Sequence, residues 1–585
     1  MRLLLILLLL WPSLAWGTDY TVCSSGCDET TIGAVFSGND LAPGETIEVQ
    51  ADAVGGTATF TDKVTWGTDD LGSAGGGYVT LQGRAGDTII IDVTEEVHDG
   101  AGLVWDDDNT EWTDEGGNVW SFPTSGVLVC CGDDTATPGR LFLDGTEYPR
   151  SDAAGNVDST ERCYYDTGTD KLYVYSVGNP VNGGAAYSSI QGSMESDAIN
   201  MADITYGKIK NITIKGGYNA GVRIARTTYS IIEDCTIGDK SMNGIEIIGT
   251  GAGDASYNEI KNCTIDSNYR FNVDWGQAIT DGIVIADYSH YNKIYGNTFT
   301  DWNHTTITMN ADNAAANGIT YNEVYNNEMS APSTSYCRPF GLSGVADVGG
   351  DSLLHHNKVY NNAMHDFTIK IQFGGEYNEF YYNMVYDFDT DSTVPEMEEA
   401  NRAFEFNWVV GTSKCRYNKV YNNTFYNINE AGFRIGAASV EVSGNLIRNN
   451  LFMNCGVVGS KNGAGVAIHI EDDADVGSNT YENNHVYKAG VTNTISYRGD
   501  GAISVATFNS KVADTVANNQ GTSTLDPLLA NPAAGLFKLQ STSPCIDTGT
   551  DVSLTTDHDG NPVGSSPDIG AYEYSSVSLR GCSIE

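Results

Sequence analysis

The sequence predicts an all-β fold, a solenoid in which short strands stack in parallel from one coil to the next. Three observations predict it: a seven-residue phrase that recurs along the chain, segments in which apolar and polar residues alternate, and an asparagine that returns at the same place in successive copies of the phrase. Repeats of roughly 20–50 residues are typical of solenoids, because each repeat can bury its apolar face only against its neighbours.

The recurring phrase has the form Tyr-Asn-x-apolar-x-x-Asn. Clear copies begin at Tyr291, Tyr321 and Tyr417. Weaker copies begin at Tyr206, Tyr229, Tyr257, His356, Tyr377, Gly444 and Ser478. Successive copies start 21 to 40 residues apart, so each copy is one coil of variable girth.

Two strands can be recognised within each coil. The first follows the start of the phrase and leads into an apolar pair such as Thr298-Phe299. The second alternates apolar and polar residues, as in Gly282-Ile283-Val284-Ile285 and Ala403-Phe404-Glu405-Phe406. A period of two is typical of a strand with one buried face. Stacked coils then pair each strand in parallel with its copy one turn further on.

The last asparagine of the phrase predicts an interior row of stacked amides. It recurs in seven consecutive copies, at Asn297, Asn327, Asn362, Asn383, Asn423, Asn450 and Asn484. At one strand spacing, about 4.8 Å, these amides can hydrogen-bond up and down the solenoid. Cys235 and Cys263 hold this place in two earlier copies. We expect two buried thiols there, because the parallel Cβ vectors of stacked residues fit a disulfide poorly.

Size and charge narrow the class of protein. The chain has 585 residues and a formal charge of −45, with 76 acidic and 31 basic side chains. It is too long for one ordinary compact core, so an elongated or multidomain shape is expected. The negative field repels phosphate backbones, which excludes nucleic acid as a partner.

The N-terminus predicts export. Arg2 precedes the apolar run Leu3–Leu10, and Ala15-Trp16-Gly17 resembles a cleavage site, so residues 1–17 are expected to be a signal peptide and the mature chain to be secreted. No later segment is apolar enough to span a bilayer. Twelve cysteines permit disulfides in an oxidising compartment. Possible pairs are Cys23/Cys27, Cys130/Cys131 and Cys545/Cys582.

These features together resemble the right-handed parallel β-helix proteins of the pectin-lyase-like superfamily. The coils of residues 188–500 carry the resemblance. Residues 18–103 resemble the N-terminal cap and first turns of secreted members, through runs such as Thr31–Phe36 and Gly86–Ile91. Residues 501–585 resemble their C-terminal capping segment, through Asp557–Pro562 and Asp568–Glu573.

Residues 104–187 interrupt the pattern. Aromatic residues such as Trp112 and Tyr173 stand among short strand-like runs that Gly- and Asp-rich turns separate. We expect a small β-rich insertion in which the aromatic side chains form the core. The alternative is that they stack on sugar rings.

Outward positions of the second strand predict a polar strip along one sheet. We expect Lys370, Glu405, Arg434 and His469 to follow one another there as the candidate catalytic residues. Candidate substrate-binding residues are Asn310, Gln372, Asn407 and Glu471. A Lys or Arg beside a carboxylate can act in proton transfer on a uronate, or with Glu and His in hydrolysis. The alternative is a purely structural set of cross-strand ion pairs.

The resemblance implies a more specific chemistry. The tentatively closest enzyme branch is that of the chondroitinase B and alginate lyase-like polysaccharide lyases, which use a Lys and an Arg with a calcium ion. Lys370 and Arg434 are residues of those types. Patterns of other branches, such as Trp-Ile-Asp-His of pectate lyases, are absent from the sequence.

A calcium site is also predicted. Asp387, Asp389, Asp391 and Glu398 follow the spacing of a calcium-binding loop, with oxygen donors at alternate positions and a final Glu. The alternative is an acidic solvated loop. The sequence predicts no organic cofactor.

Two functions are compatible with these residues. The first is a secreted carbohydrate-active enzyme, a polysaccharide lyase or else a glycosidase, that acts on an extracellular polysaccharide along a groove on one sheet. The second is a non-catalytic surface, adhesive or filament-forming protein. Self-association remains open.

Overall fold

The fold was determined as a computed structural model. It describes residues 20–96, 112–123, 141–144, 146–147, 154–159, 163–166, 169, 171–177, 180, 190–193, 196–217, 219–239, 241–267, 280–302, 304–311, 318–332, 337–344, 352–388, 402–406, 414–436, 441–456, 465–471, 479–512, 519–521 and 524–575. No helix among these residues is long and apolar enough to cross a membrane.

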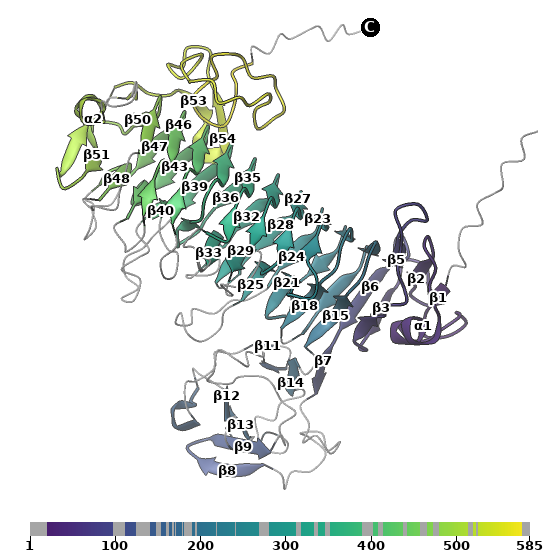
Figure 1. The fold of residues 1–585 in the computed structure, drawn as a ribbon. Coiled ribbons are helices and arrows are strands. Elements are labelled where there is room, and N and C mark those ends of the chain that lie inside the picture. Colours follow the sequence, from purple (N-terminus) through teal and green to yellow (C-terminus); the bar gives the residue numbers. More distant parts are fainter. Residues whose placement is uncertain are drawn as a thin grey trace, which may run out of the picture.

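Three long parallel sheets run along the solenoid, and each coil contributes one strand to each in turn (Figure 1). Sheet 1 contains β1 (Tyr20–Val22), β2 (Thr46–Val49), β5 (Val79–Gly83), β16 (Gly207–Lys210), β19 (Ile231–Glu233), β23 (Glu259–Lys261), β27 (Lys293–Tyr295), β31 (Glu323–Tyr325), β35 (Lys358–Tyr360), β38 (Glu379–Tyr381), β42 (Lys419–Tyr421), β46 (Leu446–Arg448) and β49 (Thr480–Glu482). Sheet 2 contains β3 (Thr57–Phe60), β6 (Thr88–Asp92), β17 (Thr213–Lys215), β20 (Thr236–Ile237), β24 (Thr264–Asp266), β28 (Thr298–Thr300), β32 (Glu328–Ser330), β36 (Ala363–His365), β39 (Met384–Phe388), β43 (Thr424–Ile428), β47 (Leu451–Cys455) and β50 (His485–Tyr487).

Sheet 3 forms the face on which the polar strip is expected. It contains β4 (Val64–Trp66), β15 (Asp197–Ala202), β18 (Ala220–Ala225), β21 (Asn243–Ile248), β25 (Asp281–Ala286), β29 (Thr305–Ala311), β33 (Arg338–Gly344), β37 (Ile371–Phe373), β40 (Arg402–Phe406), β44 (Ala431–Ile435), β48 (Ile468–Ile470), β51 (Asn493–Tyr497) and β52 (Ala502–Ser504). Short strands pair at the corner between sheets 3 and 1: β22 (Ala255–Ser256), β26 (Ser289–His290), β30 (Ile319–Thr320), β34 (Leu354–His355), β41 (Cys415–Arg416) and β45 (Val442–Ser443). The predicted β-helix is confirmed.

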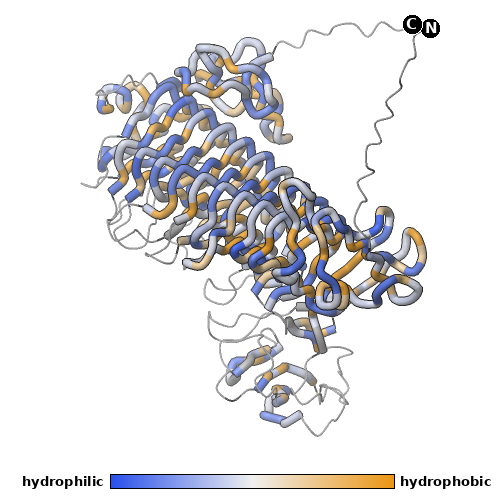
Figure 2. Tube along the Cα trace, turned by 45° about the vertical axis from the view of Figure 1, so that its right-hand side comes forward, coloured by the Kyte–Doolittle hydropathy of each residue, from blue (hydrophilic) through white to orange (hydrophobic). Residues whose placement is uncertain are grey.

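The core is the interior of the solenoid. Inward positions of all three sheets, such as Val324, Phe299 and Ile283, are fully buried and join one continuous apolar cluster. Apolar and polar residues alternate along the coils (Figure 2). Neighbouring coils therefore bury each other's apolar faces, as expected for a repeat protein.

The predicted row of asparagines is confirmed. Asn297 Nδ2 donates to Asn327 Oδ1 at 3.0 Å, and the same contact continues coil by coil to Asn484. One further residue, Asn519, extends the row.

A second asparagine row, which the sequence analysis did not predict, runs through the other asparagine of the phrase. Its members are Asn258, Asn292, Asn322, Asn357, Asn378, Asn418, Asn445 and Asn479. In both rows the described residue before each asparagine has a left-handed backbone, as at Tyr321 (φ 58°) and Asn326 (φ 54°). The sheet 1 strands from β27 to β46 are thus bounded by two corners of the same construction.

The tyrosines that open the phrase stack on the outside of the solenoid. Ring centroids of Tyr229, Tyr257 and Tyr291 lie 4.8–4.9 Å apart, and the stack continues through His356 to Tyr417. Left-handed φ is unusual for a bulky side chain. Stacking offsets this cost by about 0.5–1.5 kcal/mol per aromatic pair.

Caps cover both ends of the solenoid. Helix α1 (Ile32–Gly38) begins after Thr31, whose Oγ1 accepts a hydrogen bond from Ala34 N, and it packs on β4. Helix α2 (Val505–Lys511) packs on β51 and β52 at the other end. The C-terminal segment, with β53 (Leu529–Asn531) and β54 (Leu536–Leu539), packs on the late strands of sheet 2 (Figure 1).

The insertion protrudes beside the N-terminal half of the solenoid (Figure 1). Its antiparallel strands form two small sheets: β7 (Thr94–Glu96), β10 (Leu141–Leu143), β11 (Thr146–Glu147) and β14 (Ile190–Ser193), and then β8 (Thr113–Gly116), β9 (Val119–Pro123), β12 (Cys163–Asp166) and β13 (Lys171–Tyr175). Trp112 packs against the buried Phe122 in its core, whereas Tyr164 and Tyr173 are half-buried. The boundaries of the insertion at residues 104 and 187 stay a prediction from the sequence.

The cysteines fall into two groups. Cys23 and Cys27 form a disulfide, which is one of the three possible pairs named above. Cys235 and Cys263 are buried free thiols, as predicted. Cys545 is also a buried free thiol, whereas Cys130, Cys131 and Cys582 lie outside the described residues.

Candidate functional site

The candidate site lies on the outer face of sheet 3, towards its C-terminal end. Here the register aligns Gly341, Gln372, Glu405, Arg434 and His469 on successive strands. The inward neighbours of these positions, such as Phe404 and Phe406, belong to the core. The alternation of β40 therefore turns Glu405 away from the core.

One predicted position is wrong. Lys370 was expected in register with Glu405, but Gln372 occupies that place and Lys370 precedes β37. A slip of two residues keeps every side chain on the same face, so the alternating pattern alone does not exclude it. Lys370 nevertheless reaches Glu405 with its long side chain.

Glu405 is the centre of an ion-pair network. Its Oε2 contacts Lys370 Nζ, and its Oε1 lies 2.8 Å from Arg402 Nη2 and 2.6 Å from Arg434 Nη1. The side chains of Lys370 and Glu405 are 1% and 0% exposed. Burial alone would raise the pKa of Glu405, but the charges of Lys370, Arg402 and Arg434 outweigh it and lower the pKa to about 2. Glu405 is therefore a permanent anion at neutral pH.

Arg434 connects this buried centre with the more exposed side of the site. Its second nitrogen, Nη2, contacts Oε1 of Glu471, which follows β48. His469 lies in register with Arg434 on the neighbouring strand and is half-buried. Burial, and then the positive charge of Arg434, lower the pKa of His469 below its usual value, so its imidazole is neutral at physiological pH.

Two arginines outside the predicted outward positions also belong to the site. Arg402 stands three residues before Glu405, an odd offset that the alternation rule assigns to the opposite face. Arg338 lies at the start of β33 and donates from Nη1 to Gln372 Oε1 at 2.9 Å. Both side chains are at most 9% exposed. No repeat position marks either residue in the sequence.

A histidine one coil before Arg338 and an aspartate two coils before it form a second polar pair beside the same sheet. His304 Nδ1 lies 2.7 Å from Asp281 Oδ1, and the backbone N–H of Thr305 donates to the same oxygen. The register aligns Asp281, Thr305 and Arg338 on successive strands. Asp281 has the same place in the alternation as the core residues Ile283 and Ile285, so this pair is not part of the outward-facing strip.

The described part of the site carries a net positive charge. Arg338, Lys370, Arg402 and Arg434 are opposed by Glu405 and Glu471, which gives +2 with His469 neutral. We refer to these residues, with Gln372 and His469, as the cationic cluster. It contrasts with the formal charge of −45 for the whole chain.

The predicted substrate-binding residues are not all brought together. Glu471 and Gln372 belong to the cationic cluster. Asn310, on β29, lies three strands before β40, which corresponds to about 14 Å. Asn407 lies outside the described residues.

The predicted calcium loop is described at one residue. Asp387 has a left-handed backbone (φ 53°), and its Oδ1 accepts a hydrogen bond from Asn427 Nδ2 at 2.5 Å. Asp389, Asp391 and Glu398 lie outside the described residues. Within the part of the chain that the structure describes, no three His, Cys, Asp or Glu side chains are grouped to hold a metal ion.

Comparisons with known proteins agree with the fold. A family model described as "Right handed beta helix region" matches residues 197–363. No curated protein sequence matches the chain. A solved structure described as the complex of XylC with xylose is 13% identical with a TM-score of 0.51, and the match covers 95% of this chain and 98% of that one.

Two further structures have lower scores. Pectate lyase Pel9A is 13% identical with a TM-score of 0.39, over 95% of this chain and 96% of the other. A mannuronic acid-specific family 6 polysaccharide lyase from human gut microbiota is 10% identical with a TM-score of 0.38, over 88% and 93%. At 13% identity the likeness to the XylC complex concerns the fold alone, and the family model describes that fold as a right-handed β-helix.

Proposed function

We propose that this β-helix protein is a secreted enzyme that cleaves an anionic, uronate-containing polysaccharide by β-elimination on the outer face of sheet 3. The observation that carries the proposal is the cationic cluster. A protein with a charge of −45 repels anionic glycans over most of its surface, and a local +2 provides a place where a carboxylate is attracted.

Arg434 is the residue proposed to bind the uronate carboxylate. It is 14% exposed, in contrast to the sealed Lys370 and Glu405, and its planar guanidinium suits a carboxylate. Glu405 and Glu471 hold it from two sides. Neutralising the substrate carboxylate makes the proton on the adjacent carbon more acidic, because the developing negative charge spreads onto that carboxylate.

His469 is the proposed general base. Its neutral imidazole can take the proton from the carbon next to the carboxylate. The electron pair of that C–H bond then forms a carbon–carbon double bond, the glycosidic C–O bond breaks, and the leaving oxygen takes up a proton. The products are an unsaturated uronate end and a new reducing end.

Lys370 and Glu405 are proposed to position Arg434 rather than to transfer protons. Lys370 is buried and its ammonium is neutralised by Glu405. Hydrolysis is less well supported than elimination, since a glycosidase needs a carboxylic acid that is protonated near neutral pH. The pKa of Glu405, about 2, is far too low for that role.

Calcium is a separate proposal. Asp387 would supply one carboxylate to the ion, because its half-exposed side chain lies at the beginning of the predicted loop. A bound calcium would add positive charge for an anionic glycan. Calorimetric titration with calcium chloride tests this, and Asp387→Asn is expected to weaken binding whereas Asp366→Asn, an exposed aspartate on a different turn, is not.

Export is proposed from the N-terminal sequence alone. The first 17 residues have the order of a secretory signal. N-terminal sequencing of the mature protein is expected to begin near Thr18, and a mature chain that retains Met1 would contradict export by this signal.

The experiment for the cleavage proposal is incubation with a panel of alginate, polygalacturonate, chondroitin sulfate and neutral glycans. Arg434→Gln is expected to lower kcat/KM on the cleaved uronate polymer about 100-fold or more. The matched control is Arg223→Gln, which removes a similar ion pair, Arg223 to Glu246, from the same sheet. Equal activity of the two variants would remove Arg434 from the mechanism.

A non-catalytic, adhesive role is the second candidate. The complete burial of Lys370 and Glu405 in mutual ion pairs favours it, because buried cross-strand pairs can serve structure alone. Glycan binding without any cleaved product, over the whole panel, would support this function against the enzyme.

A further inference from the structure

The N-terminal cap leaves one sheet end open. In sheet 1, β1 pairs with β2, and in sheet 3, α1 packs on β4. Sheet 2 begins with β3, and within the described residues no further strand pairs with its outer edge. A cavity of about 530 Å³ lies there, which is within the usual size of ligand sites.

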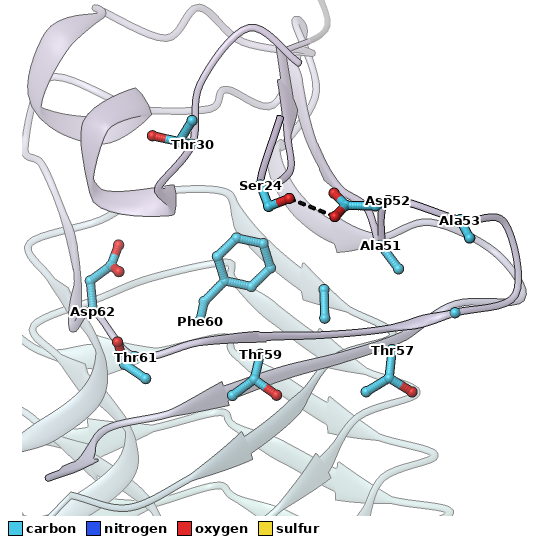
Figure 3. A pocket seen from close by; sticks show the side chains of 12 residues that line it. Ser24, Thr30, Ala51, Asp52, Ala53, Thr57, Thr59, Phe60, Thr61 and Asp62 are labelled. Atoms are coloured by element: carbon cyan, nitrogen blue, oxygen red, sulfur yellow. Dashed lines mark hydrogen bonds between the residues drawn. The ribbon is translucent and has the colours of Figure 1, made fainter. Parts of the chain in front are cut away.

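The cavity is lined by the Phe60 side chain and by polar residues of the cap (Figure 3). Phe60, at the end of β3, stands between Ser24 and Asp52 on one side and Thr59 on the other (Figure 3). Further lining comes from Thr30, from residues 51–53 and from residues 56–62. The hydroxyl of Ser24 lies on the cap side of the Phe60 ring and can donate and accept hydrogen bonds, whereas the side chains of Thr57 and Thr59 point to the opposite face of β3 (Figure 3).

Two carboxylates lie at opposite sides of the cavity. Asp52 accepts a hydrogen bond from Ser24 Oγ at 2.6 Å. Oδ2 of Asp62 is buried and accepts no hydrogen bond within the described residues. A buried carboxylate oxygen without a donor is costly, so this atom calls for a ligand that supplies an O–H or N–H group.

We infer that this cavity binds a neutral sugar unit. The lining contains two carboxylates and no Lys or Arg, which disfavours anionic sugars. A neutral pyranose has hydroxyl groups to donate to Asp62 and Asp52. Its apolar C–H face can contact the part of the Phe60 side chain, 8%, that is exposed.

This site differs from the cationic cluster in its place and in the sign of its charge. It lies on the first strand of sheet 2, whereas the cluster lies on late strands of sheet 3. The inference does not depend on the proposed cleavage. If both proposals hold, the protein binds a neutral sugar at the N-terminal end of the solenoid and cleaves at uronate units on sheet 3.

The test is saturation-transfer NMR on the full-length protein with glucose, galactose, mannose and N-acetylglucosamine, and with glucuronate as the anionic counterpart. We expect transfer to at least one neutral sugar and none to glucuronate. Asp62→Asn is expected to raise Kd about 10-fold, the usual effect of losing a hydrogen bond to a charged group. Asp69→Asn, an exposed aspartate outside the cavity, is expected to leave Kd unchanged.

Ser24→Ala provides a second variant, because Ser24 is exposed, its hydroxyl lies beside Asp52 in the cavity, and its replacement leaves the core intact. It is expected to weaken sugar binding even if Asp62→Asn disturbs the cap. The inference is overturned if no neutral sugar shows transfer, if glucuronate binds as well, or if folded variants bind like the unaltered protein. Calcium chloride alone is the final probe, and calcium binding that Asp62→Asn abolishes, without sugar binding, would make the cavity a cation site.

Discussion

Lys370 and Arg434 hold the two oxygens of one carboxylate, that of Glu405, from opposite sides. Lys370 Nζ contacts Oε2, and Arg434 Nη1 lies 2.6 Å from Oε1. Because Arg402 also binds Oε1, the buried carboxylate of Glu405 forms ion pairs with three cationic side chains. This arrangement fixes the direction of Arg434 and keeps Glu405 ionised, and both the stability and the proposed chemistry depend on it.

Glu405→Gln is expected to destabilise the protein by about 3–5 kcal/mol, because it leaves three buried or half-buried cations without their shared anion. Urea unfolding followed by circular dichroism measures the change. Lys419→Gln is the control, since Lys419 is 46% exposed and its pair with Glu379 contributes at most about 1 kcal/mol. Equal losses in the two variants would contradict the central place of Glu405.

The pH dependence of cleavage follows from His469. The neutral imidazole is the active form, and burial and Arg434 lower its pKa. The rate is therefore expected to be flat above the usual titration range of histidine and to fall only below it. Measured pH profiles of kcat/KM check this, and an acid limb at or above neutral pH would exclude His469 as the base.

His485 gives a prediction about stability. Its ring is buried, one ring nitrogen lies 3.0 Å from the Leu525 carbonyl oxygen, and burial lowers its pKa from 6.5 to about 4. The folded state thus holds His485 neutral, so its contribution is complete above pH 6.5 and is lost as the pH falls towards about 4. The loss amounts to about 3 kcal/mol. In His485→Gln this part of the acid destabilisation is expected to vanish, and an unchanged slope would contradict the assignment.

We expect the loss of a single asparagine side chain from either row to lower the free energy of unfolding strongly. Asn327 accepts from the backbone and side chain of Asn297 and donates to Ile294 O and Asn362 Oδ1. Asn327→Ala leaves several of these buried groups unpaired and is expected to cost at least about 3 kcal/mol. The adjacent Asn326→Gly changes an exposed left-handed residue and should cost under about 1 kcal/mol. Denaturant midpoints of the two variants decide the comparison.

The fold could be predicted because its determinants are local and repeated. The phrase places an asparagine after each left-handed corner, so the row from Asn297 to Asn484 is visible without a structure. The second row, from Asn258 to Asn479, carries the same signal in the Tyr-Asn pair that opens the phrase. It was missed because Tyr at a left-handed corner is not an expected residue.

The site could be predicted only in part, because its contacts depend on register and on side-chain reach. Glu405, Arg434 and His469 do follow one another on adjacent strands. The sequence could not show that Gln372, and not Lys370, pairs with Glu405. A shift of two residues leaves an alternating pattern unchanged, so both registers fit it equally well. Arg402 escapes the same pattern because its length, and not its position in the alternation, brings it to Glu405.

Burial of the ion pair was also not predictable. The alternating pattern assigns Lys370 and Glu405 to the outer face, and an outer position normally implies contact with water. Both are at most 1% exposed. Whether an outward-facing side chain is buried depends on which distant segments of the chain pack over it. A local sequence pattern does not give this information.

The most direct test of the proposed function is the mass of the oligosaccharides released from a uronate polysaccharide. Elimination predicts products with an unsaturated end, lighter by one water than the products of hydrolysis, from the unaltered protein and from Arg223→Gln. His469→Gln and Arg434→Gln are expected to release them at least about 100-fold more slowly. Saturated products, or unsaturated products at equal rates from all four proteins, would contradict elimination at the cationic cluster.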